Sequence, residues 1–240
     1  MNAYFKEIES LMKKVIQEEQ ESVENIAAEM TKRLSLGGIV QLFGSGHSHL
    51  IAEEPFFRAG GLVPVRPIIV ESLMLHNGAS QASTNEKDPE FTQKFAEQLD
   101  IRPEDVVIII STSGRNVVPI DVAYIAKESG AYVVSLQSLT YNASEQPSKH
   151  HSGNRLEDVT EAVLNTHVTV GDGLLISEGM PYAPASGVIG NMLLHATFSR
   201  VIGMMIESGI QPPIFKSANL DGSSTHNEQM IATYGKRIKF

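Results

Sequence analysis

The sequence predicts an α/β fold: a three-layer α/β/α sandwich around a parallel sheet of about five strands, preceded by a helical extension. Three observations support this prediction. Short apolar runs alternate along the chain with segments of helical periodicity. Two of these runs end in loops rich in serine and glycine, as strands do at the binding edge of a parallel sheet. The composition, 42% hydrophobic and 20% charged, is that of a chain that folds throughout its length.

The first 35 residues form an amphipathic region. Apolar residues recur there at spacings of three and four, which indicates one long helix or two shorter ones. Gly37 and Gly38 end this region. The apolar run 39–43 then stops at a glycine, which is the pattern of a buried parallel strand.

Further strands are predicted by apolar runs at residues 63–70, 106–110, 131–136 and 167–170, and helical spacing is seen between them at 88–99 and 116–129. Crossovers of this length join parallel neighbours in a right-handed sense. The pattern therefore predicts a doubly wound, flavodoxin-like sheet with the strand order 2-1-3-4-5.

The carboxyl-terminal part is predicted to be helical. Residues 186–207 are apolar over most of a helix circumference, which indicates a buried helix that packs centrally or against another subunit. Pro212 and Pro213 end it. We expect a single domain over residues 1–240, made of a helical extension (1–36), an α/β core (37–178) and carboxyl-terminal helices (179–240).

The composition excludes several functions. Cysteine is absent, so disulfides, thiolate catalysis and cysteine zinc sites are excluded. The formal charge is −9 and no basic stripe is present, which disfavours nucleic acid as a partner. The amino terminus lacks the pattern of a signal peptide, and no apolar stretch has the length of a membrane span. We therefore expect a cytoplasmic protein without nucleic-acid or membrane partners.

Two hydroxyl-rich loops are the candidate binding site. The first strand ends in Gly-Ser-Gly-His-Ser at residues 44–48, and the third in Ser-Thr-Ser-Gly at 111–114. In the order 2-1-3-4-5 these strands are neighbours, so the loops face the same crevice and their hydroxyls converge on one phosphate. The alternative is that the serines only cap the helices that follow.

These two loops resemble the phosphate-binding segments of the sugar isomerase (SIS) domain family in content, order and spacing. The resemblance implies that Ser45, Ser48, Ser111 and Ser113 bind the phosphate of a small-molecule sugar phosphate. We expect no cofactor. It also implies a homo-oligomer, a dimer or tetramer. The expected phosphate-binding set is Gly44, Ser45, Gly46, His47, Ser48, Ser111, Thr112, Ser113 and Asn116.

Aldose–ketose isomerisation requires a group that opens the sugar ring and a carboxylate that moves a proton between adjacent carbons. We favour Glu54 as this carboxylate, with His195 and Glu178 as further catalytic candidates. Each has a structural alternative, since His195 lies among apolar neighbours as a core histidine would. Other candidates are His47, His49, Glu53, His150 and His151.

The amino-terminal helix, the helix after residue 186 and the tail at 217–222 resemble the phosphoheptose isomerase and muramic acid phosphate etherase branch of the family. Phosphoheptose isomerases use a metal bound by His and Glu. Here Glu54 and Arg58 occupy the positions of that histidine and glutamate, so we expect no metal. An isomerase that works through an enediol is the first hypothesis, and the alternatives are an etherase or lyase and a non-catalytic sugar-phosphate sensor.

Overall fold

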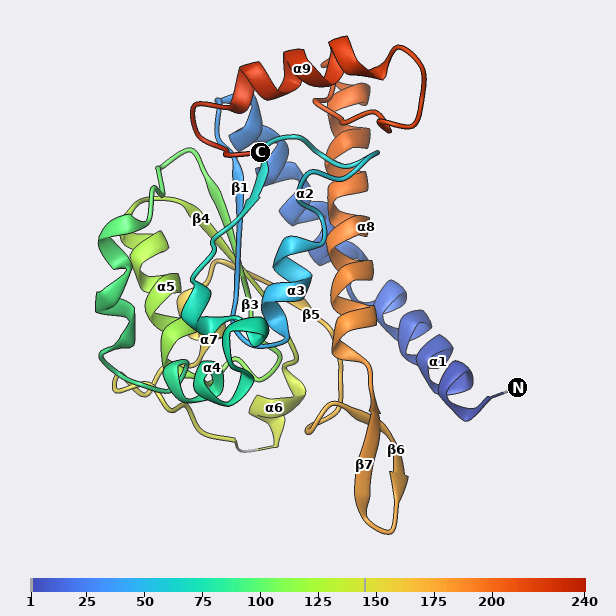
Figure 1. Ribbon diagram of the computed structural model, residues 1–240. Helices are drawn as coiled ribbons and strands as arrows, with labels where there is room; N and C mark the ends of the chain where they lie inside the picture. The colour runs from blue at the N-terminus through green and yellow to red at the C-terminus, as the bar shows by residue number, and fades with distance from the viewer. Residues whose placement is uncertain (1, 145) are drawn as a thin grey trace.

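The computed structural model describes residues 2–144 and 146–240 (Figure 1). Its centre is a parallel sheet of five strands in the order β2-β1-β3-β4-β5, as predicted. The strands are β1 (Val40–Gly44), β2 (Val65–Pro67), β3 (Val106–Ile110), β4 (Tyr132–Gln137) and β5 (Ala162–Asn165).

The pairing of β1 with β3 positions the two loops. Every residue of both strands is buried, which explains their continuous apolar runs. The register pairs Val40 with Val106 and Gly44 with Ile110, so both strands end at the same level. The loops that follow therefore start side by side at the carboxyl edge of the sheet.

Helices cover both faces of the sheet (Figure 1). Side chains of β1, β3 and β4 alternate between the two layers because successive residues of a strand point to opposite faces. One layer holds α1 (Ala3–Glu18), α2 (Gln20–Ser35), α3 (Ser48–Glu53) and α8 (Ser186–Glu207). The other holds α5 (Val117–Glu128) and α7 (Leu156–Val159). It also holds Phe91, which starts the short 3₁₀ turn Phe91–Lys94, and Phe95, which joins that turn to the next one, Ala96–Gln98.

Some elements differ from the sequence-based expectation. Residues 88–99 contain the two 3₁₀ turns in place of one regular helix. The fifth strand runs over Ala162–Asn165 and not over 167–170, because the chain leaves the sheet at His167, which has φ +53°. The His167 ring lies 2.8 Å from a carboxylate oxygen of Glu19, at the junction of α1 and α2.

Helix α8 begins and ends where the sequence predicts, but it is buried on one side only. That side packs against α2 and the sheet, while Val188 and Ile206 are exposed. Contrary to the expectation that no apolar stretch has the length of a membrane span, α8 qualifies by length and composition alone, a test that core helices also pass. Its apolar character is explained by the core that it covers.

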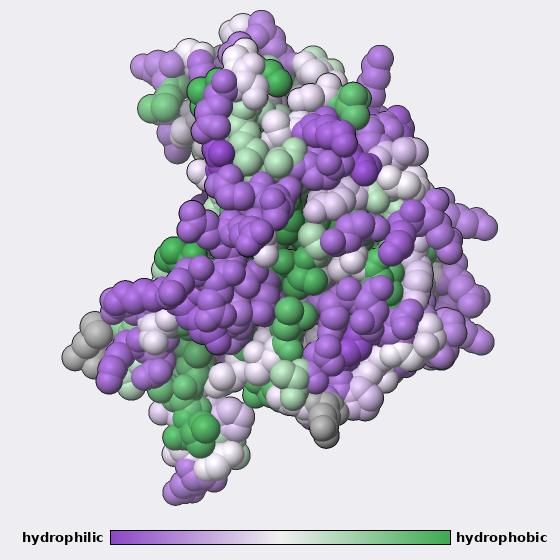
Figure 2. Space-filling model, turned by 180° about the vertical axis from the view of Figure 1, so that it is seen from behind, coloured by the Kyte–Doolittle hydropathy of each residue, from purple (hydrophilic) through white to green (hydrophobic). Residues whose placement is uncertain are grey.

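A hairpin of β6 (Gly173–Ser177) and β7 (Met180–Pro184) was not predicted. It projects from the body of the molecule beside the start of α8 (Figure 1). Ile176, Met180 and Tyr182 on it are more than half exposed, and the hairpin forms a hydrophobic protrusion in the space-filling view (Figure 2). These apolar side chains have no core of their own to fill.

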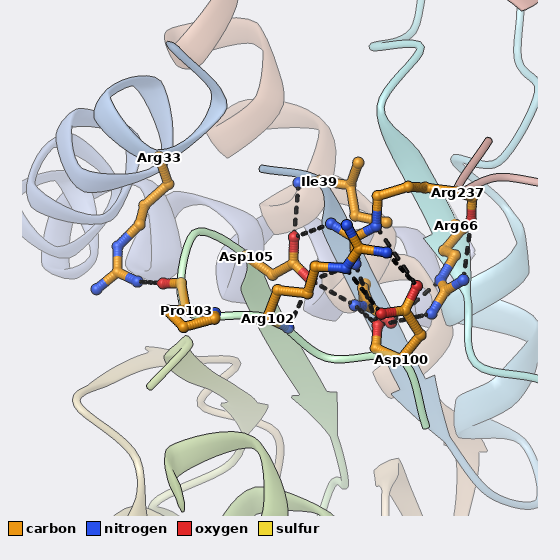
Figure 3. Close-up of polar contacts among 9 residues, drawn as sticks. Arg33, Ile39, Arg66, Asp100, Arg102, Pro103, Asp105 and Arg237 are labelled. Carbon is orange, nitrogen blue, oxygen red and sulfur yellow. Dashed lines mark hydrogen bonds and ion pairs between the residues drawn. The ribbon is translucent and has the colours of Figure 1, made fainter. Parts of the chain in front are cut away.

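The amino-terminal edge of the sheet is closed by the carboxyl-terminal segment. After α9 (Ser223–Tyr234), Arg237 forms a bidentate ion pair of 2.7 and 2.8 Å with the fully buried Asp105 (Figure 3). Burial disfavours the charged form of Asp105, but hydrogen bonds from Arg237, Ile39 and Arg102 outweigh burial and hold the pKa of Asp105 below its usual value. This network lies at the opposite end of the strands from the two loops.

Candidate functional site

The first loop leaves β1 and turns directly into α3. Gly44 is required by close packing, because a Cβ at this position would lie 2.4 Å from the backbone oxygen of Ser48. The N–H of Ser48 donates to the carbonyl of Ser45 at 3.0 Å, and the N–H of Gly46 donates to the carbonyl of Leu73 at 2.9 Å. The backbone of the loop is therefore fixed before any ligand binds.

The second loop leaves β3 and leads into α5, with Asn116 as the residue before the helix. Gly114 adopts φ +60°, and its N–H donates to the carbonyl of Ser111 at 3.0 Å. From outside the loop, Arg155 donates to the carbonyl of Ser113 at 2.5 Å. These contacts hold the loop by its carbonyl groups.

Both loops line one cavity of about 460 Å³. Of the predicted phosphate-binding residues, Gly44 lies behind the cavity in β1, and the others line it. Those lining residues are Ser45, Gly46, His47, Ser48, Ser111, Thr112, Ser113 and Asn116. The sheet order and the shared register thus place the two loops as the sequence analysis expected.

Several hydrogen-bonding groups of this cavity have no partner in the described part of the chain. The hydroxyl of Ser45 is buried and makes no hydrogen bond. The N–H groups of His47, Thr112 and Ser113 donate to no protein acceptor within residues 2–144 and 146–240. Ser45 is buried, whereas His47 is exposed and Thr112 and Ser113 are half-buried. Because buried polar groups are almost always paired, the unpaired Ser45 hydroxyl, with free N–H donors beside the same cavity, indicates that the cavity receives an acceptor-rich ligand.

A second depression of about 490 Å³ continues from the first, since the two share His47, Ser48, Thr112, Asp172 and Ser186. It runs between α3 and the start of α8, where Ile51 and Asn191 line it. The side-chain oxygen of Asn191 is buried and has no partner among the described residues. The groove therefore extends the polar site along α3.

Glu54 and His195 lie one helical turn beyond this groove, Glu54 three residues after Ile51 and His195 four residues after Asn191. A carboxylate oxygen of Glu54 lies 2.6 Å from Nε2 of His195. The other oxygen contacts the guanidinium of Arg58. The structure brings Glu54 and His195 together, although they are 141 residues apart in the sequence.

Of the other acid–base candidates, His47 lines the loop cavity, and three lie elsewhere. Glu178 occupies the exposed turn of the β6–β7 hairpin, apart from the Glu54–His195 pair. His49 is buried, with its Nδ1 against the carbonyl of Gly46. His150 is also buried and pairs with Asp121 at 2.9 Å, so it fastens its loop to α5 and does not line the loop cavity.

Residues 3–138 match the family model of the SIS domain. The chain belongs to the SIS domain family. The resemblance carried by the two loops is thereby confirmed. The protein is also 50% identical over 240 residues to the "UPF0309 protein in nagA 3′ region" of Lysinibacillus sphaericus, covering 100% of this chain and 98% of that protein. A UPF0309 protein of Geobacillus kaustophilus is 47% identical over 240 residues, covering 99% and 95% of the two chains.

Solved structures share the fold of this SIS domain. A phosphoheptose isomerase from Neisseria gonorrhoeae superposes with a TM-score of 0.54 at 18% identity, covering 84% of this chain and 96% of that one. The NanR protein of Vibrio vulnificus, solved in complex with ManNAc-6P, superposes with a TM-score of 0.53 at 13% identity, covering 99% of this chain and 69% of that one. At such identities the likeness shows the fold alone.

The SIS-domain cavity includes residues that the sequence analysis missed. Tyr141, Asp172 and Ser186 enter from segments far from either loop, and Ser83 and Glu86 enter from the helix α4 (Ala79–Asn85) and its carboxyl end. The carboxylate of Asp172 accepts three hydrogen bonds at the start of α8, from Ala185 and Ser186. No local motif marks these positions, because only the folded chain brings them together.

The residues around Glu54 do not fit a metal ion. Arg58, a cation, contacts one carboxylate oxygen of Glu54, and His195 contacts the other, so both oxygens already have partners. Throughout the described residues, no group of three or more His, Cys, Asp or Glu side chains is arranged to hold a metal. The arrangement is instead that of one carboxylate in contact with an imidazole nitrogen and a guanidinium.

Proposed function

We propose that this SIS domain protein binds a sugar phosphate and isomerises it between the aldose and ketose forms. The observation that carries the proposal is the cavity between the two loops, with the unpaired hydroxyl of Ser45 and the free N–H groups of His47, Thr112 and Ser113. A phosphate ester offers acceptor oxygens to such donors. The names of the phosphoheptose isomerase and of the NanR complex agree with this ligand class.

In this proposal Glu54 and His195 carry out the proton transfers. Glu54, held between His195 and Arg58, removes the proton from the carbon beside the carbonyl and returns it to the neighbouring carbon of the enediol. His195 exchanges protons with the sugar oxygens, first when the ring opens and then as the enediol forms. One carboxylate and one imidazole suffice for this reaction.

The position of Glu54 determines how the sugar must lie. Six residues of helix separate Ser48 from Glu54, a rise of about 9 Å. The phosphate on the loops and the carbonyl at Glu54 must therefore stand at opposite ends of the sugar. The groove between α3 and α8 connects the two positions, and Asn191 is available there for a sugar hydroxyl.

Proton exchange tests the proposal. A panel of aldose and ketose phosphates of five to seven carbons is incubated with the protein in D₂O, and NMR follows deuterium incorporation beside the carbonyl. The wild-type protein should exchange, Glu54→Gln should bind without exchange, and Glu53→Gln, the adjacent carboxylate, should behave as wild type. Ser113→Ala should weaken binding by about 1–3 kcal/mol, because a hydroxyl to a charged oxygen is lost.

The outcomes separate the alternatives. Binding without exchange in the wild type would indicate a sensor. Cleavage of an ether-linked substituent without isomerisation would indicate an etherase or lyase. Exchange that survives in Glu54→Gln would reject the assignment of the base.

We further propose that the protein is a single-domain, cytoplasmic homo-oligomer. The exposed apolar side chains of Ile176, on one face of the hairpin, and of Met180 and Tyr182, on the other, support an oligomer, since exposed apolar surface marks protein interfaces. Light scattering coupled to gel filtration measures the assembly. A monomer at micromolar concentration would contradict this part of the proposal.

A further inference from the structure

Three basic side chains surround the second loop on its outer side. Arg115 follows the loop directly, and its carbonyl accepts the N–H of Lys149 at 2.8 Å. Its guanidinium donates to the carbonyl of Pro147 at 2.9 Å, which ties the segment of Lys149 to the loop. Lys87 reaches the same region from the end of α4, where its ammonium lies 3.1 Å from the hydroxyl of Ser83, a cavity residue.

We call these three cations the cationic rim (Lys87, Arg115 and Lys149). In the described part of the chain, no carboxylate oxygen lies within 4.0 Å of their charged nitrogens. Burial lowers the pKa of Lys149, and repulsion from Arg115 and Lys87 lowers it further. The protein has a formal charge of −9, so three cations without carboxylate partners give this part of the surface a positive charge that the chain as a whole does not have.

The cavity beside them lacks positive charge. The described residues that line it include no lysine or arginine but do include the carboxylates of Glu86 and Asp172. Asp172 is occupied by its bonds to α8, whereas Glu86 makes no side-chain hydrogen bond to residues 2–144 or 146–240 and raises the pKa of Lys149 by its charge. A phosphate dianion in this cavity would therefore contact only hydroxyl and amide donors, and the unpaired carboxylate of Glu86 would repel it.

We propose that the cationic rim supplies the positive charge for the phosphate group of the ligand, and that Glu86 opposes it. This inference rests on the proposed function. Lys87 and Lys149 attract the dianion across the mouth of the cavity. Arg115 holds the loop segment that carries Lys149 in place. The free carboxylate of Glu86 lowers the affinity for phosphate, which favours release of the bound ester.

The test measures binding of inorganic phosphate and of fructose 6-phosphate by calorimetry at pH 7.5 and at two ionic strengths. At ~10 mM salt, Lys149→Gln and Lys87→Gln should each weaken binding about three- to sixfold, since a nearby unit charge is little screened from a dianion in dilute salt. At ~0.5 M salt the differences should fall below twofold. The wild type itself should lose affinity as salt rises.

Two further variants make the test specific. Glu86→Gln should tighten binding about threefold or more at low salt, a gain that a purely structural role of Glu86 would not produce. Lys236→Gln removes the same charge next to Arg237, which pairs with Asp105 at the opposite end of the sheet, and should leave binding unchanged. Wild-type protein that binds neither probe would overturn both this inference and the proposed function. If the wild type binds but the two lysine variants bind as tightly as it does, or if Glu86→Gln binds more weakly than the wild type, the proposed role of the cationic rim is overturned and the proposed function is not.

Discussion

Replacing Ser45 by alanine should stabilise the free protein and weaken its ligand binding at the same time. The hydroxyl of Ser45 is buried and makes no hydrogen bond in the described structure. A buried polar group without a partner costs about 1–3 kcal/mol, so its removal should raise the free energy of unfolding by about 1 kcal/mol. In a domain of this length that raises Tm by about 2–4 °C.

Binding should change in the opposite direction. If the hydroxyl donates to a phosphate oxygen, Ser45→Ala loses a charge-assisted hydrogen bond, and the affinity for fructose 6-phosphate falls by about 1–3 kcal/mol, or five- to 150-fold. Differential scanning calorimetry gives the stability and titration calorimetry gives the affinity.

The matched control is Ser138→Ala. Ser138 is also fully buried, but its hydroxyl already donates to the carbonyl of Val168 at 2.6 Å, and it lies outside the cavity lining. This variant should lose about 1 kcal/mol of stability and keep its affinity. A Ser45→Ala protein that is less stable than wild type, or that binds as tightly, would refute the reasoning.

Two further predictions concern stability. Gly46 and Gly114 both have positive φ, but a Cβ is unobstructed at Gly46 and would lie 1.8 Å from Oε1 of Gln137 at Gly114. Urea unfolding should therefore show a loss of about 1–2 kcal/mol for Gly46→Ala and clearly more for Gly114→Ala; equal losses would contradict the packing of the second loop. Asp105→Asn breaks the buried pair with Arg237 and should cost about 3–5 kcal/mol near pH 7. Because the pKa of Asp105 is lowered in the folded protein, this contribution is present above the unfolded pKa of about 4 and fades as the pH falls through the folded value. A difference between variant and wild type that stays constant from pH 7 to pH 3 would oppose this assignment.

The parallel sheet and the two loops were predictable because their signals are local and repeated. Buried parallel strands have continuous apolar runs, and β1 and β3 each lead from such a run into a glycine- and serine-rich turn. The strand order then placed the two loops together. The pairing of Glu54 with His195 was not predicted, since the two are distant in sequence and a histidine in an apolar helix also fits a place in the core.

Other features depend on contacts between distant segments. The hairpin at residues 173–184 contains glycine and proline residues and short runs that gave no strand signal, and its exposed apolar side chains follow no core-facing pattern. Asp172 reaches the cavity only because it caps α8. The strand predicted at 167–170 was misplaced because the apolar run continues past the point where His167 turns the backbone away from the sheet.

A crystal structure of the protein soaked with fructose 6-phosphate is the most direct test of the central claim, which is that donors from both turns hold one phosphate. We predict phosphate oxygens about 2.7–3.2 Å from the hydroxyls of Ser45 and Ser113 and from the N–H groups beside them, with the sugar directed along α3. A phosphate bound by one loop only, or bound elsewhere while this cavity holds solvent, would contradict the account.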